Sequence, residues 1–147
     1  MSYRLPVFKI QAIRESSSTA DYRRVESPFA AAEILRAYLN GADREHCVAL
    51  LLDNRHQVIG IHTVSIGTLN ASLVHPREVF KAAIVVGSAA IILGHNHPSG
   101  DPTPSTEDLA LTSRMKQAGE LLGIPVLDHV VIGEEQRFTS LTQNGLF

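Results

Sequence analysis

Alternating hydrophobic and polar positions predict a strand near the start of the chain. In VFKIQAIRE, residues 7–15, the apolar side chains of Phe8, Ile10 and Ala12 fall on one side and polar side chains on the other. This period of two is typical of a half-buried strand. We therefore expect the chain to enter its fold through a strand over this stretch.

Helix start and stop signals predict three helices. The stretch SPFAAAEILRAYLNG predicts a helix over residues 27–41, in which Ser27 caps the first turn and Pro28 takes the first helical position. A loop then leads to a second helix over about residues 77–87. The stretch STEDLALTSRMKQAGELLG, over residues 105–123, has apolar side chains at helical spacing and a terminal glycine, which predicts the third.

Apolar runs between these helices predict further strands. Residues 47–67 combine a six-residue apolar run, a polar turn and a second strand, which is the pattern of a hairpin with a buried first arm. Residues 89–93 predict a central buried strand, and 124–133 and 137–140 predict two more. The order βαββαβαββ implies an α/β (α+β) fold, a mixed β-sheet flanked by helices, in a single domain over residues 1–147.

Composition and charge narrow the class of protein. The 147 residues are 44% hydrophobic and carry a net charge of −2. This charge argues against a surface made mainly to bind nucleic-acid phosphates, although it is compatible with a local basic patch. One cysteine, Cys47, cannot form an internal disulfide and is best placed in the core. The apolar stretch AAIVVGSAAIIL is too short to span a bilayer. We expect a cytoplasmic protein with no membrane segment.

The stretch GHNHPSGDPTPSTED, residues 94–108, carries the candidate chemistry. In an extended chain residues two apart point to the same side, so His95 and His97 can converge on one metal ion. Neutral imidazole is a favoured zinc ligand. The prolines that follow stiffen the connection to the next helix and would fix its distance from the two histidines.

Two helix starts are compatible with the end of this stretch. Ser105 and Asp108 match a capping box, in which each side chain bonds the other residue's backbone. Alternatively Thr103 caps a helix that has Pro104 at its first position, which frees Ser105 and Asp108 on one face of the first turns. In that arrangement Asp108 becomes a third metal ligand, and spacing alone leaves both arrangements open.

Two histidines and an aspartate would leave one tetrahedral position for water, as in a catalytic zinc site. Zinc lowers the pKa of bound water to about 7, although this donor set would also accept iron or manganese. A hydroxyl such as that of Ser105 could stabilise the oxyanion, a role typically worth about 3 kcal/mol.

The wider motif resembles a known family. His95, His97, Ser105 and Asp108 form the pattern H-x-H-x7-S-x2-D of the JAMM metalloproteases, whose fold is the MPN domain. The strings HNHPSGDPTPS, GTLNASLVHPREVF and LDHVVIG are similar to the RadC-like branch, over roughly residues 27–133. The resemblance implies an MPN fold, similar in architecture to cytidine deaminases, and zinc-dependent cleavage of a peptide or isopeptide bond by metal-activated water.

The resemblance also implies roles outside this stretch. The family has a glutamate before its first central strand, and EHCVAL places Glu45 there, with valine where the family often has glycine. Glu45 is therefore the expected general base, with Glu78 as the alternative. His129 in LDHVVIG is expected to support the structure or to orient a ligand. Asn96 stands where the JAMM pattern usually has serine or threonine. Asparagine at this position is similar to the RadC-like branch.

A second function stays open at this point. RadC-like proteins are often described as DNA repair proteins, so the alternative is an accessory protein of DNA repair or of mobile elements, with the metal site acting on or near nucleic acid. Members typically carry an N-terminal region similar to helix-hairpin-helix modules, and we expect this chain to be a stand-alone MPN domain without one. A peptide or protein substrate is the expected partner, and the sequence carries no signal for oligomeric state.

Overall fold

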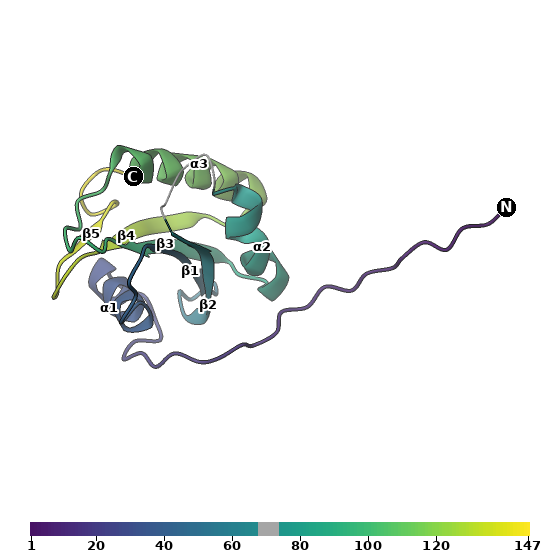
Figure 1. Cartoon of the computed structure of the whole chain (residues 1–147), viewed down its shortest axis with the longest axis horizontal. Helices are drawn as coiled ribbons and strands as arrows, with labels where there is room; N and C mark the ends of the chain where they lie inside the picture. Colours follow the sequence, from purple (N-terminus) through teal and green to yellow (C-terminus); the bar gives the residue numbers. More distant parts are fainter. Residues whose placement is uncertain (68–73) are drawn as a thin grey trace.

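The predicted helices and strands form, with one exception, close to where the sequence places them (Figure 1). The computed structural model describes residues 1–67 and 74–147. Over this part of the chain the elements are α1 (Pro28–Tyr38), β1 (His46–Leu52), β2 (Val58–Ile66), α2 (Pro76–Val86), β3 (Ala90–Asn96), α3 (Thr106–Leu122), β4 (Val126–Ile132) and β5 (Phe138–Ser140).

Local signals explain where the helices begin and end. Ser27 Oγ accepts a hydrogen bond of 3.1 Å from the backbone N–H of Ala30, and Pro28 fills the first position of α1 as expected. Gly123 takes a left-handed conformation, with φ 73°, that ends α3. Residues 68–73 of the predicted loop before α2 lie outside the described residues.

The sheet is mixed, in the order β2-β1-β3-β4-β5. β1 is antiparallel to both of its neighbours, β3 and β4 are parallel, and β5 is antiparallel to β4. The register pairs Cys47 with His95 and Leu93 with His129. The start of β1 and the end of β3 therefore lie side by side at one end of the central strands, next to β4.

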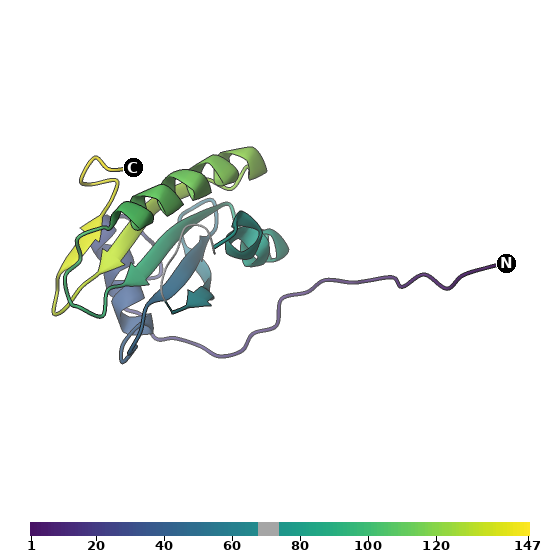
Figure 2. The ribbon, with the colours of Figure 1, turned by 45° about the horizontal axis from the view of Figure 1, so that its top comes forward.

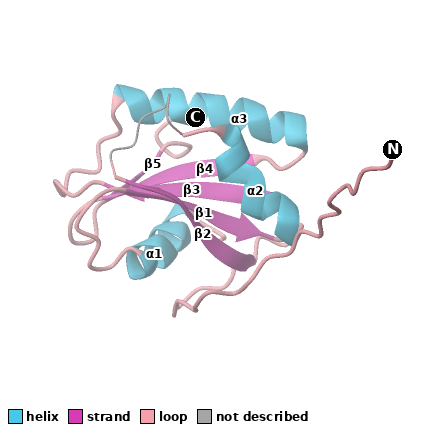
Figure 3. Cartoon of the chain, turned by 45° about the vertical axis from the view of Figure 1, so that its right-hand side comes forward, coloured by secondary structure: helices cyan, strands magenta, loops and turns pink. Residues whose placement is uncertain are grey.

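Helices cover both faces of the sheet, with α2 and α3 on one face and α1 on the other (Figures 1 and 3). Alternate residues of β1 belong to two clusters, with Ala49 and Leu51 under α2 and α3, and Val48 and Leu50 against α1. Burial on both faces explains why this strand reads as one continuous apolar run. The predicted sheet flanked by helices is confirmed.

The strand predicted over residues 7–15 is wrong. Residues 1–20 form no helix or strand and extend away from the sheet (Figures 1 and 2). Phe8 is 83% exposed and Ile10 77%. Alternation describes how side chains would sort on a strand, but a strand also needs a neighbour for its backbone N–H and C=O groups. Backbone contact with the hairpin occurs at Arg23, whose carbonyl accepts the N–H of Val58, and at Arg24, which forms an isolated bridge with Gln57.

The helices can also be compared with membrane spans. Within residues 1–67 and 74–147, none of them combines the length and the apolar character needed to cross a bilayer.

Candidate metal centre

The end of β3 brings the two motif histidines together. His95 lies within the strand and His97 follows its last residue, so both rings point to the same side. Their Nε2 atoms lie 2.9 Å apart. His95 is fully buried, and the His97 side chain is 13% exposed. One ring is thus enclosed in the protein, while the other borders solvent.

The turn after β3 fixes the His97 ring. The backbone N–H of His97 donates to the carbonyl of Ile132 at 2.9 Å, and its Nδ1 lies 2.8 Å from the carbonyl oxygen of Asp101. A carbonyl oxygen only accepts, so Nδ1 carries the hydrogen and Nε2 keeps its lone pair. Gly100, with φ 89°, makes the tight turn that returns the chain toward the ring.

Asp108 combines the two arrangements that the sequence left open. Ser105 is the N-cap of α3, and not Thr103: its Oγ accepts the Asp108 N–H at 3.0 Å, and Asp108 Oδ2 accepts the Ser105 N–H at 2.8 Å. The same carboxylate reaches the histidines. Its Oδ1 lies 3.2 Å from His95 Nε2, and its Oδ2 lies 3.1 Å from His97 Nε2. Capping the helix therefore aims the carboxylate at the two rings.

Burial and neighbouring groups set the charges of this centre. Burial acts to raise the pKa of Asp108, but the adjacent His95 and the groups of Ser105 outweigh it and hold that pKa below its usual range, so the carboxylate is ionised. Burial lowers the pKa of His129 well below the usual histidine value. Burial, together with the Asp108 and Glu45 carboxylates, raises the pKa of Cys47 to about 12, and this cysteine lies in the core as predicted.

Glu45, the predicted general base, lies beside the histidines. It immediately precedes β1, and its Oε1 is 4.0 Å from His97 Nε2. Ligand atoms of Glu45, His95 and His97 all lie within 4.8 Å of one another. The Glu45 side chain is 25% exposed. It therefore stands on the solvent side of the centre.

Asn96 holds the backbone around Glu45, a role that the sequence analysis missed. Its Oδ1 accepts the N–H of His46 at 2.8 Å, and its Nδ2 donates to the carbonyl of Arg44 at 3.0 Å. The residue between the two histidines thus fixes the chain on both sides of the predicted base. A signal was present, since this position departs from the usual JAMM pattern, but its partners lie some 50 residues away along the chain.

The other predicted site residues occupy different surroundings. Glu78 forms an ion pair with Lys81 at 2.9 Å on the exposed side of α2, and that hydrogen bond lowers the pKa of Glu78. Ser105 is exposed at the start of α3, and its Oγ already accepts the capping hydrogen bond. Its hydrogen is not used in that bond, so a role as a donor to an oxyanion stays a prediction.

A buried histidine stands behind His95. His129 Nε2 lies 2.7 Å from His95 Nδ1, and Thr112 Oγ1 lies 2.5 Å from His129 Nδ1. The Thr112 hydroxyl also donates to the carbonyl of Asp108 at 2.7 Å. These contacts lie on the side of His95 opposite the ring nitrogen that faces Asp108.

The donor set fits a divalent metal ion. Two ligands at about 2.0 Å from a tetrahedral zinc lie about 3.3 Å apart. The two Nε2 atoms lie 2.9 Å apart, Asp108 Oδ1 lies 3.2 Å from His95 Nε2 and Oδ2 lies 3.1 Å from His97 Nε2, so each contact is within a few tenths of an ångström of that spacing.

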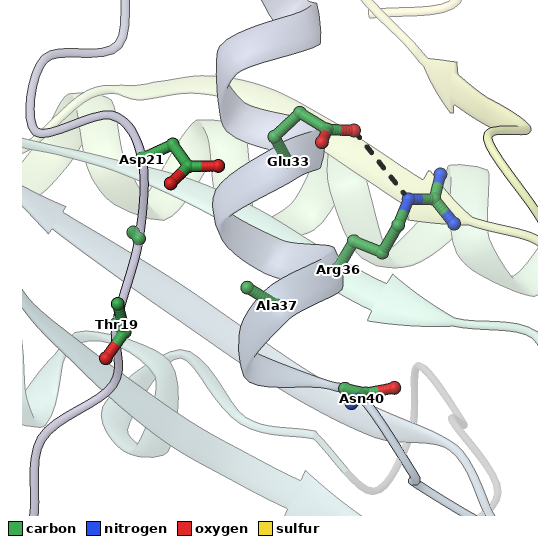
Figure 4. A pocket seen from close by; sticks show the side chains of 7 residues that line it. Thr19, Asp21, Glu33, Arg36, Ala37 and Asn40 are labelled. Atoms are coloured by element: carbon green, nitrogen blue, oxygen red, sulfur yellow. Dashed lines mark ion pairs between the residues drawn. The ribbon is translucent and has the colours of Figure 1, made fainter.

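Two surface hollows adjoin α1. One, of about 360 Å³, has Asn96, His97 and Glu134 in its lining and therefore opens beside the candidate centre. The other, of about 330 Å³, lies between residues 19–21 and α1, and Figure 4 shows the Glu33–Arg36 pair on its α1 side. Of these two hollows, only the first borders His97.

The chain also matches known proteins over most of its length. The model of the RadC-like JAB domain matches residues 25–146. A UPF0758 protein of Desulforamulus reducens is 59% identical over 108 residues, which cover 74% of this chain and 47% of that protein. The UPF0758 protein SH1266 of Staphylococcus haemolyticus is 51% identical over 124 residues, which cover 84% and 54%. The chain spans about half the length of these relatives, and its matched region shows that it belongs to the RadC-like JAB domain family.

Proposed function

We propose that this protein is a zinc-dependent hydrolase of the JAMM type that cleaves a peptide or isopeptide bond. The observation that carries the proposal is the convergence of His95, His97 and Asp108, with Glu45 at the solvent side of the same centre. A carboxylate beside a metal centre that borders solvent is the arrangement that hydrolysis requires, because a proton must leave water and reach the departing amine.

His95, His97 and Asp108 would hold the zinc ion. When bound there, zinc supplies a Lewis acid for the substrate carbonyl and lowers the pKa of water toward about 7. Asp108 contributes one negative charge, and its position is fixed by the cap of α3. His97 borders the hollow of about 360 Å³, through which a substrate chain would reach the centre.

Glu45 would carry the proton during the reaction. Its carboxylate accepts a proton from the attacking water as the oxygen bonds to the carbonyl carbon, and it delivers that proton to the nitrogen as the C–N bond breaks. The clamp by Asn96 on the backbone at Arg44 and His46 supports this role, because general acid–base transfer requires a fixed carboxylate. The Ser105 hydroxyl would donate to the oxyanion.

Substitution of Glu45 tests the proposal. Glu45→Gln keeps the size of the side chain but removes its basic oxygen, so we expect unchanged zinc binding and loss of turnover by about 100-fold or more. Glu78→Gln is the matched control and should leave both properties intact. Zinc content would be measured by metal analysis, and turnover on panels of peptide, isopeptide and DNA substrates. An active Glu45→Gln protein, or cleavage of DNA alone, would refute this mechanism.

A further inference from the structure

A continuous buried hydrogen-bonded path links the main chain of α3 to His95. It runs from the Asp108 carbonyl to the Thr112 hydroxyl at 2.7 Å, on to His129 Nδ1 at 2.5 Å, and from His129 Nε2 to His95 Nδ1 at 2.7 Å. Thr112 is 2% exposed, and both histidines are fully buried. Water therefore cannot reach these groups and compete for their hydrogen bonds.

The first contact fixes the direction of the others. The Asp108 carbonyl has no hydrogen to give, so the Thr112 hydroxyl donates to it. The Thr112 oxygen then accepts, and His129 Nδ1 must carry the hydrogen between them. A neutral His129 with its hydrogen on Nδ1 has a lone pair on Nε2, which accepts from His95 Nδ1.

We propose that Thr112 and His129 are positioning residues that hold His95 with its hydrogen on Nδ1, so that the Nε2 lone pair faces the metal centre. This inference rests on the proposed function, because it assigns His95 to zinc. With the path reversed, Thr112 would donate to His129, and His95 would carry its hydrogen on Nε2. That hydrogen would point at Asp108 and prevent His95 from binding a cation.

The fold couples two ligands through this path. Thr112 lies one helical turn after Asp108, so the residue whose carboxylate faces the histidines also supplies the carbonyl that orients Thr112. The parallel pairing of β3 with β4 sets Leu93 opposite His129, which brings His129 behind His95. A shift of α3 would therefore disturb the carboxylate ligand and the His95 tautomer together.

The tautomer can be measured without any metal. In the metal-free protein at about pH 8, above the usual histidine pKa, ¹⁵N NMR of the ring nitrogens distinguishes the two neutral forms. We expect His95 to carry its hydrogen on Nδ1 in the wild type and in Thr112→Ser, which keeps the hydroxyl. In Thr112→Val, which keeps the β-branched shape but loses the hydroxyl, we expect a substantial shift toward the Nε2–H form.

Zinc affinity provides the second measurement. Loss of a group that orients a metal ligand typically weakens binding 10- to 100-fold. Competition with a chromophoric chelator should give a loss in that range for Thr112→Val and less than about threefold for Thr112→Ser. Thr139→Val on β5 makes the same change away from the path and should match the wild type. Far-UV circular dichroism checks the fold, and Thr112→Ala replaces the valine variant if that variant does not fold.

The outcomes separate the two proposals. Dominant Nε2–H on His95 in the wild type would overturn the path, and so would a Thr112→Val protein with unchanged tautomer and affinity. A wild type with the expected tautomer that fails to bind zinc would support the path and refute the proposed function. Loss of affinity in both Thr112→Val and Thr112→Ser would count against the hydroxyl as the acting group.

Discussion

Asp108 holds the first turn of α3 and faces the two histidines with the same carboxylate. Its Oδ2 accepts the Ser105 N–H at 2.8 Å and also lies 3.1 Å from His97 Nε2. A carboxylate has lone pairs enough for a backbone donor and a metal ion, so the two functions do not compete. The capping bond restricts the side-chain torsions, which means that the carboxylate already faces the two histidines.

Ser105 separates helix capping from catalysis in a testable way. Ser105→Ala loses the cap acceptor and should lower the free energy of unfolding by about 1 kcal/mol, measured by urea denaturation. Ser105→Asp restores an acceptor at the cap but supplies no hydrogen, so we expect stability near that of the wild type. If the hydroxyl stabilises the oxyanion, both variants should lose turnover by about 100-fold while keeping zinc. Full activity in Ser105→Asp would leave Ser105 as a cap alone.

Side-chain pairs close in sequence could be predicted, and pairs brought together by the sheet could not. The spacing of His95 and His97 indicated that both rings face one side, because the strand period acts over a few residues, whereas spacing alone left Asp108 open between a cap and a ligand. The partners of Asn96 at Arg44 and His46, and the contact of Thr112 with His129, could not be predicted, since only the fold brings these atoms together. Asn96 bonds His46 across 50 positions of the chain.

At the scale of the elements, α1 packs closely against β3 on the face opposite the two histidines. Gly94 precedes His95, and a Cβ built on Gly94 would lie 2.5 and 2.6 Å from the two Cδ atoms of Leu35. Leu35 is fully buried in α1. The missing side chain therefore allows α1 to pack directly on the strand that carries His95.

Gly94→Ala should disturb both packing and metal binding. Overpacking in a filled core costs about 1–3 kcal/mol, so we expect a loss of that size in the free energy of unfolding and weaker zinc binding as β3 shifts. Gly60→Ala on β2 is the matched control, because its added Cβ would meet only Leu51 of β1, at an ordinary 3.5 Å. Calorimetry and chelator competition measure the two effects. Equal stability of the two alanine variants would contradict this account of Gly94.

For the molecule as a whole, the sequence predicted the layered sheet because buried strands and capped helices are signalled locally and repeatedly. The prediction of a strand over residues 7–15 was wrong because the alternating pattern does not indicate whether a neighbouring strand is available. β2 is an edge strand of the sheet, and the backbone of residues 23–25 contacts its start and the turn before it, where Arg24 forms an isolated bridge with Gln57. Two backbone bonds, from Val25 to His56 and from Val58 to Arg23, support that bridge.

The extended start of the chain should therefore be dispensable for folding. Deletion of residues 1–16 removes exposed side chains but keeps the Arg24 bridge, so we expect a change of less than about 0.5 kcal/mol in the free energy of unfolding and unchanged zinc affinity. Deletion of residues 1–26 also removes the bridge and the buried Val25, and should be clearly destabilising. Limited proteolysis of the full chain should cut first within residues 1–20. Strong destabilisation by the shorter deletion would mean that Phe8 and Ile10 are buried in solution, as the alternating pattern first suggested.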